Sequence, residues 1–147
     1  MRDVTVRPAT TDDLTGILGV LDAAALETDA DRVRASVGRG DAFVAVRDET
    51  GAADGGTVLG AVVLVGTDQP DIAHIDAVAV RRRQRGRGIG RALVAAAADR
   101  DDRLTAAFSA GVRPFYESLG FDIETVENGE HDRYRGVLRG GIPHDDE

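Results

Sequence analysis

The order of short apolar segments predicts an α/β fold in which one mixed, mostly antiparallel sheet carries helices on both faces. Three observations support this prediction. Runs rich in valine, isoleucine, leucine and alanine are separated by glycine, proline and acidic residues. Apolar residues recur at helical spacing near the N-terminus. A glycine-rich turn follows a long strand and leads into an alanine-rich helix, which gives the order β-α-α-β-β-β-α-β-α-β-β.

The N-terminal elements begin with capping signals. A threonine followed three residues later by an aspartate resembles a capping box, and this pattern occurs twice. Glycines after the second apolar stretch predict its end. The predicted elements are a strand at Val4–Arg7, a helix over about 11–26 capped by Thr10 and Asp13, and a weaker helix capped by Thr28 and Asp31 and ended by Gly38 and Gly40.

The remaining elements follow from alternating runs of apolar and turn residues. They are strands at Ala42–Arg47, Thr57–Gly66, Ile72–Val80, Arg103–Phe108, Phe121–Glu127 and Arg133–Leu138, helices at Ala92–Asp99 and Val112–Leu119, and turns at Asp48–Gly56, Thr67–Asp71, Gly120 and Asn128–Gly129.

The length of 147 residues fits one domain, which we place at residues 1–139, followed by a polar tail at 140–147. Cysteine is absent, which excludes disulfides and cysteine-based zinc sites, and no bound metal is expected. The N-terminus lacks a signal-peptide layout, and no apolar run approaches the length of a membrane span. These features predict a cytoplasmic protein without a membrane partner.

The charge distribution is uneven. All 18 basic residues are arginines, and the net charge is −8. The segment 81–91 carries +6, so the remainder carries −14. A strongly acidic, lysine-free surface suits a halophilic protein, whose self-repulsion is screened by salt. A GC-rich genome, which favours arginine, aspartate, alanine and glycine codons, explains the same composition.

The glycine-rich turn predicts an anion site, because a strand, a glycine loop and a helix together direct backbone N–H groups at a phosphate. A Walker loop requires a lysine, and the sequence has none. A dinucleotide fingerprint beginning at Gly86 requires glycine where Arg91 stands. An RNA-binding patch is a further alternative, but the acidic remainder repels a polyanion and no aromatic residues interleave with the arginines.

Two segments carry a family resemblance. Arg85-x-x-Gly88-x-Gly90 follows the strand that ends in Val78-Ala79-Val80, and Phe115-Tyr116-Glu117-Ser118-Leu119-Gly120-Phe121 lies downstream. In motif, spacing and element order, the chain resembles the GNAT superfamily of N-acetyltransferases over nearly its whole length. The resemblance implies a single GNAT-like domain that transfers acetyl from acetyl-CoA directly to a primary amine, in a ternary complex.

Glycines in the loop let the backbone approach the CoA pyrophosphate without obstruction by Cβ atoms. Arginines beside them add charge-assisted hydrogen bonds. The resemblance adds the backbone of the preceding strand as the contact for the pantetheine arm, and a serine where the family often has asparagine. The predicted cofactor-binding residues are Val78, Ala79, Val80, Arg85, Gly86, Arg87, Gly88, Ile89, Gly90, Arg91 and Ser109.

The resemblance also implies catalytic roles. Tyr116 stands where many family members have the tyrosine that protonates the CoA sulfur, although a packed helix aromatic is the alternative. His74 and Asp76 share one face of their strand and are candidates for the general base. They are equally consistent with structural residues at a sheet edge, and many members of the family need no dedicated base.

Several questions stay open at this level. The acceptor is a small molecule or a protein N-terminus, and Glu27–Gly40 and Asn128–Arg133, with His131, are expected near it. Arg81–Arg83 either contact the 3′-phosphate of CoA or balance the acidic surface. A CoA-binding sensor module without useful catalysis is the alternative function, and a homodimer is not excluded.

Overall fold

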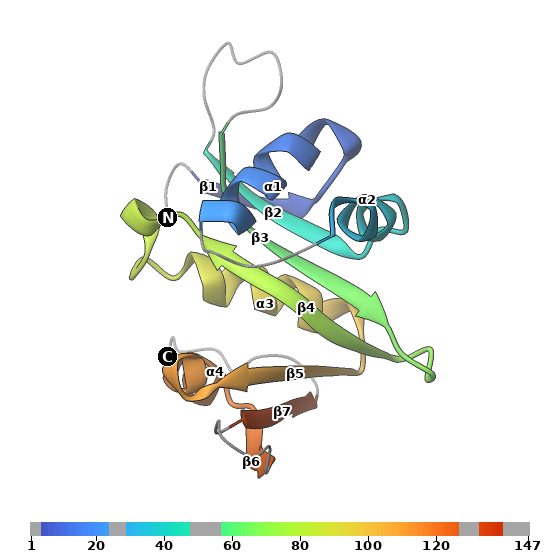
Figure 1. Cartoon of the computed structure of the whole chain (residues 1–147), viewed down its shortest axis with the longest axis vertical. Coiled ribbons are helices and arrows are strands. Elements are labelled where there is room, and N and C mark those ends of the chain that lie inside the picture. Colours follow the sequence, from blue (N-terminus) through green and yellow to red (C-terminus); the bar gives the residue numbers. More distant parts are fainter. Residues whose placement is uncertain (1–3, 24–28, 48–56, 127–132, 140–147) are drawn as a thin grey trace. The chain divides into compact units, whose positions relative to one another are not determined.

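The computed structural model describes residues 4–23, 29–47, 57–126 and 133–139 (Figure 1). Its strands and α-helices are β1 Val4–Pro8, α1 Leu14–Ala23, α2 Ala30–Gly38, β2 Ala42–Arg47, β3 Thr57–Gly66, β4 Ile72–Val80, α3 Ile89–Arg100, β5 Arg103–Ser109, α4 Arg113–Ser118, β6 Asp122–Val126 and β7 Arg133–Arg139. Short 3-10 turns lie at Thr11–Asp13, Arg82–Gln84 and Ala110–Val112.

The strands form one sheet in the order β1-β2-β3-β4-β5-β7-β6. The pairs β1–β2, β2–β3, β5–β7 and β6–β7 are antiparallel, whereas β4 and β5 are parallel. The predicted α/β class with a mixed, mostly antiparallel sheet is therefore confirmed.

Two local predictions are corrected. The helix after the glycine loop begins at Ile89 rather than Ala92, because the Ala92 N–H already donates to the Gly88 carbonyl at 3.0 Å. The second capping residue is Asp29, whose side chain accepts a hydrogen bond from the Asp31 N–H at 2.9 Å. Aspartate is at least as effective an N-cap as threonine, and Asp29 directly precedes Ala30, the first residue of α2.

Some predicted features lie outside the described residues. They are the helix end at 24–26, the cap Thr28, the hairpin loop 48–56, the turn Asn128–Gly129, the tail 140–147, and Glu27, Glu130, His131 and Asp132.

The chain divides into two compact units, to which β4 and α3 each contribute residues. The first unit comprises Met1–Val65 and Asp76–Ala97, and the second comprises Gly66–Ile75 and Ala98–Glu147.

In the first unit, helices cover both faces of the strands (Figure 1). On the opposite face from α1 and α2, α3 packs close to β3: a Cβ added at Gly60 would lie 3.2 Å from Leu93 Cδ1 and 2.9 Å from the Ala79 carbonyl oxygen. Only glycine allows this approach of two backbones and a helix. The core beneath α1 and α2 consists of Ala9, Ile17, Val20, Leu21, Val33, Val37, Ala42, Val44, Val46, Val58, Ala61, Val63, Ala77 and Ala79.

A partly buried ion pair holds the 3-10 turn before α1 to β1. Arg7 donates from Nη1 to Asp13 Oδ2 at 2.8 Å and from Nη2 to Oδ1 at 3.0 Å. The Thr10 N–H donates to the same carboxylate at 2.8 Å, which confirms the predicted capping box. Burial by itself raises the pKa of Asp13, but the hydrogen bonds from Arg7 and Thr10 and the charge of Arg7 outweigh it, so the pKa lies below 3.8.

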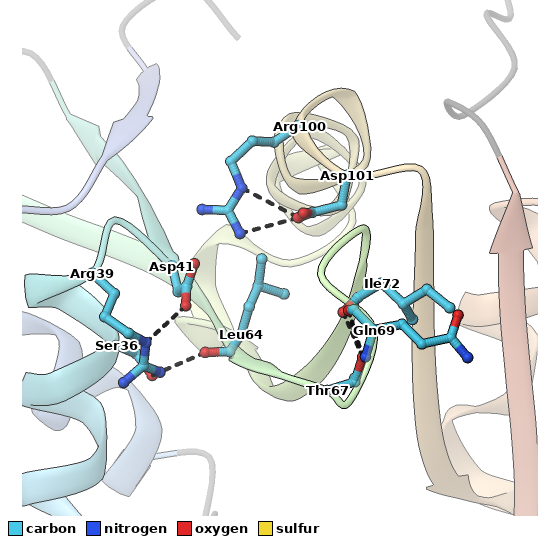
Figure 2. Close-up of polar contacts among 9 residues, drawn as sticks. All are labelled: Ser36, Arg39, Asp41, Leu64, Thr67, Gln69, Ile72, Arg100 and Asp101. Atoms are coloured by element: carbon cyan, nitrogen blue, oxygen red, sulfur yellow. Dashed lines mark hydrogen bonds and ion pairs between the residues drawn. The ribbon is translucent and has the colours of Figure 1, made fainter.

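The C-terminal end of α2 is fastened to β3. The buried Ser36 hydroxyl donates to the Leu64 carbonyl at 2.9 Å, and Arg39 Nε donates to Asp41 Oδ2 at 3.0 Å (Figure 2). Gly40, with φ of +79°, reverses the chain into β2, as its position predicted. These contacts fix the position of the C-terminal end of α2.

The second unit is organised around aromatic side chains. The Tyr116 ring stacks on Phe108 with centroids 4.3 Å apart and meets Phe115 and Phe121 edge-on at 5.1 Å each. Pro114 lies in the first turn of α4, as predicted, where its missing N–H costs nothing. Ring contacts thus link two residues of α4, Phe115 and Tyr116, to each other and to Phe108 and Phe121.

Candidate functional site

The loop 81–88 joins β4 to α3 within the first unit. Gly86 and Gly88 have φ of +79° and +84°, a region that other residues rarely adopt. The first hydrogen bond of α3 runs from the Ala92 N–H to the Gly88 carbonyl, so the N–H groups of residues 88–90 precede the helical ladder. Strand, left-handed glycines and helix N-terminus together form a cradle suited to a phosphate.

Arg81 attaches this loop to β3. Its backbone N–H donates to the Leu59 carbonyl at 2.8 Å, and its side-chain Nε donates to the Val58 carbonyl at 2.8 Å. Arg82 and Arg83 belong to the exposed 3-10 turn that follows. The first arginine of the basic run therefore positions the loop, which the sequence did not reveal.

The arginines predicted to bind the anion are themselves partly engaged. Arg85 Nε donates to the Val80 carbonyl at 3.0 Å, which holds the exposed side chain against the end of β4. Arg87 Nη1 lies 3.5 Å from Gln84 Oε1, at the limit of a hydrogen bond. Arg91 is half-buried on α3. The guanidinium groups of Arg85 and Arg87 remain at the exposed loop beside the glycines.

Burial alternates along β4, so the strand presents two distinct faces. Ala79 is buried in the core, whereas Val78 and Val80 are half-buried on the other face. Ile89, at the start of α3, is 1% exposed, so only its backbone is available to a ligand.

Asp76 lies on the same face of β4 as Val78, and it is paired. Arg32 Nη2, from α2, lies 3.0 Å from Asp76 Oδ1. The Asp76 side chain is 19% exposed and the Arg32 side chain 54%. This ion pair links the side chain of Asp76 on β4 to the side chain of Arg32 on α2.

His74 belongs to the second unit, where β4 pairs with β5. Its Nδ1 lies 2.8 Å from Thr105 Oγ1, and the two residues face each other in the parallel register. Either ring tautomer can make this bond, since a hydroxyl donates or accepts. Of the two base candidates, His74 is therefore bonded to a neutral hydroxyl and Asp76 to a cation.

Tyr116 also belongs to the second unit. It is 5% exposed, and burial raises its pKa to about 12. Its ring contacts Phe108, Phe115 and Phe121, but its hydroxyl makes no hydrogen bond to another described residue. Its phenol is therefore a neutral donor at physiological pH.

Ser109, the last predicted cofactor contact, is exposed at the end of β5 and precedes the 3-10 turn Ala110–Val112. The structure thus gathers Asp76, Val78–Val80 and the glycine loop in the first unit, and His74, Ser109 and Tyr116 in the second. Arg32 and Gly60 were not anticipated. A glycine inside a run of β-branched residues was the available signal for Gly60, and Arg32 had none.

The family model described as "Acetyltransferase (GNAT) domain" matches residues 38–123, which include β2–β5, the glycine loop and α4. The chain belongs to the GNAT acetyltransferase family. The GNAT assignment predicted from the Arg85–Gly90 and Phe115–Phe121 motifs is thereby confirmed.

Solved structures show the same GNAT fold at low sequence identity. An acetyltransferase of the GNAT family from Bacillus cereus superposes with a TM-score of 0.76 and 17% identity, covering 93% of this chain and 97% of that one. The ribosomal-protein-S18-alanine N-acetyltransferase from Escherichia coli gives 0.71 and 19%, covering 97% of each chain. Arabidopsis thaliana Naa50, solved with a bisubstrate analogue of CoA and a peptide, gives 0.74 and 15%, covering 92% and 98%.

No curated protein sequence matches this GNAT chain significantly. In the described part of the chain, no helix is long and apolar enough to cross a membrane. The same residues contain no group of three or more histidine, aspartate or glutamate side chains arranged to hold a metal ion.

Proposed function

We propose that this GNAT protein is an N-acetyltransferase that moves the acetyl group of acetyl-CoA to a primary amine by direct transfer in a ternary complex. The observation that carries the proposal is the cradle at Gly86–Ile89, which combines two left-handed glycines with a helix N-terminus. Anions bind such a cradle through backbone N–H groups. Acetyl-CoA, the cosubstrate of the family, carries a pyrophosphate group, which is an anion that this cradle can bind.

The predicted cofactor-binding residues fall into two groups, which bind different parts of acetyl-CoA. In the proposal, the N–H groups of 86–91 bind the pyrophosphate, with Arg85, Arg87 and Arg91 adding positive charge. The backbone at Val78–Val80 and the hydroxyl of Ser109 bind the pantetheine arm. The terminal guanidinium nitrogens of Arg85 serve this role, because its Nε is bonded to Val80.

In the reaction, the neutral amine attacks the thioester carbonyl, a C–N bond forms, and the C–S bond breaks. The amine loses its proton to Asp76 or His74 through water, or to solvent, and the sulfur leaves as a thiolate. Tyr116 then acts as a donor to that sulfur. Because a thiol has a pKa of about 8.5 and Tyr116 one of about 12, a hydrogen bond from the phenol is favoured over complete proton transfer.

Binding of acetyl-CoA is the first test of the proposal. We expect calorimetry to show one site per chain, with an affinity that falls only modestly between low and molar salt. RNA binding through phosphates alone would weaken steeply over the same range. The absence of any heat at millimolar acetyl-CoA would remove the proposal, whereas binding without CoA release over a broad amine panel would favour a sensor module.

Tyr116→Phe is expected to lower turnover by roughly 10- to 100-fold, the low end of acid-catalysis effects. Acetyl-CoA affinity should change little, because the ring contacts stay the same. The matched control is Tyr134→Phe, which removes the hydroxyl of the other tyrosine of the chain. Equal rates for both variants and wild type in a CoA-release assay would exclude Tyr116 from the chemistry.

A further inference from the structure

The ion pair between Arg32 and Asp76 differs from the other ion pairs of α2. Arg34 pairs with Asp31 within the helix, and Arg39 pairs with Asp41 just beyond it. Among the described residues, the Arg32–Asp76 pair alone joins α2 to a central strand. It therefore sets a positive and a negative group side by side on β4, from elements distant in the sequence.

The pair is open to a ligand. The Arg32 side chain is 54% exposed and Asp76 is 19% exposed, and the contact joins Nη2 to Oδ1. A guanidinium carries five N–H donors and a carboxylate about four acceptor positions. The one contact uses a single guanidinium nitrogen of Arg32 and a single carboxylate oxygen of Asp76.

The ion pair lies close to the segment of β4 that is proposed to bind acetyl-CoA. Asp76 precedes Val78 by two residues, so both side chains lie on the same half-buried face of β4. In the proposed function, Val78–Val80 binds the pantetheine arm, which carries the thioester at its end. An amine held at the Asp76 carboxylate would thus lie about one strand repeat, ~7 Å, from that segment.

We infer that the acceptor is a small α-amino acid, with its amine bound at Asp76 and its carboxylate bound at Arg32. This inference rests on the proposed acetyltransferase function. An α-amino acid separates its two charges by one carbon atom, which matches two side chains already in contact at 3.0 Å. A planar guanidinium also binds a carboxylate through two parallel hydrogen bonds. Of the two acceptor classes, this favours the small molecule over a protein N-terminus, whose α-carboxyl is part of a peptide bond.

The test compares the standard amino acids with their α-amides in a CoA-release assay. We expect at least one amino acid to exceed its own amide by about 10- to 100-fold in kcat/KM, the range expected for a hydrogen bond to a charged group. The preference should appear mainly in KM. The amine of the amide is more often neutral and hence intrinsically more reactive, so a preference for the acid reports recognition.

Arg32→Met should reduce the ratio of acid to amide to about one, and Arg32→Lys should retain part of it, because the charge remains without the planar fork. Arg34→Met is the matched control, since Arg34 is equally exposed on the same helix, and it should keep the full ratio. Thermal melting establishes that all three variants are folded.

The outcomes separate the inference from the function on which it rests. If amines are acetylated with no preference for the acid, or if Arg32→Met keeps the preference, the α-amino acid inference is overturned and the acetyltransferase stands. If acetyl-CoA binds but no amino acid is acetylated, the inference is likewise overturned. If acetyl-CoA does not bind, the proposed function itself fails, and the inference with it.

Discussion

Gly88→Val is expected to abolish acetyl-CoA binding, with a loss of at least 100-fold in affinity, while the protein stays folded. Gly88 has φ of +84°, and a Cβ added there meets no protein atom within 4 Å. The side chain therefore does not clash inside the protein, but it occupies the approach to the loop N–H groups. Losing two hydrogen bonds to a charged phosphate costs about 3–6 kcal/mol, which corresponds to a 100-fold loss or more.

The matched control is Gly40→Val. Gly40 has φ of +79°, and its added Cβ also meets nothing within 4 Å. Both variants thus carry similar backbone strain, about 1–2 kcal/mol or somewhat more for a branched residue, but only one alters the loop. Calorimetry should show that Gly40→Val binds acetyl-CoA like wild type. If both variants bind equally well, the cradle lies elsewhere.

Arg7→Met is expected to destabilise the protein by about 3 kcal/mol at neutral pH, because it leaves the buried Asp13 carboxylate without its cation. We take the lower end of the usual range, since the Arg7 side chain is 30% exposed and Asp13 keeps the Thr10 N–H. For a domain of this size, the loss corresponds to a fall of about 10 °C in Tm. Chemical denaturation of both proteins measures the difference in unfolding free energy.

The pH dependence provides the control for this prediction. Because the folded-state pKa of Asp13 is lowered, its contribution is fully present above the ordinary value of 3.8 and is lost as the pH falls through the lower folded value. The gap between wild type and Arg7→Met should therefore shrink as the pH falls below 4. Arg139→Met, which removes an exposed ion pair with Asp122, should change stability little at any pH. A gap that persists at low pH would assign the loss to packing of the arginine stem.

The sequence determined the features that arise from local spacing. β-branched runs form β2, β3 and β4 with the predicted bounds, because alternation and turn residues act over a few positions. The glycines of the loop permit left-handed backbone, and Gly86 and Gly88 adopt it. Thr10 and Asp13 form their capping box for the same reason, since all its partners lie within one turn.

The tertiary structure decided which side chains meet across the chain. Arg81 attaches the loop to β3, Arg32 reaches Asp76, and Tyr116 is enclosed by Phe108 and Phe121. Such contacts depend on strand register and on how a helix packs, and no local periodicity encodes them. The sequence alone therefore predicted the family and the glycine loop proposed as the cradle. The ion pair between Arg32 and Asp76, which suggests an acceptor, is visible only in the tertiary structure.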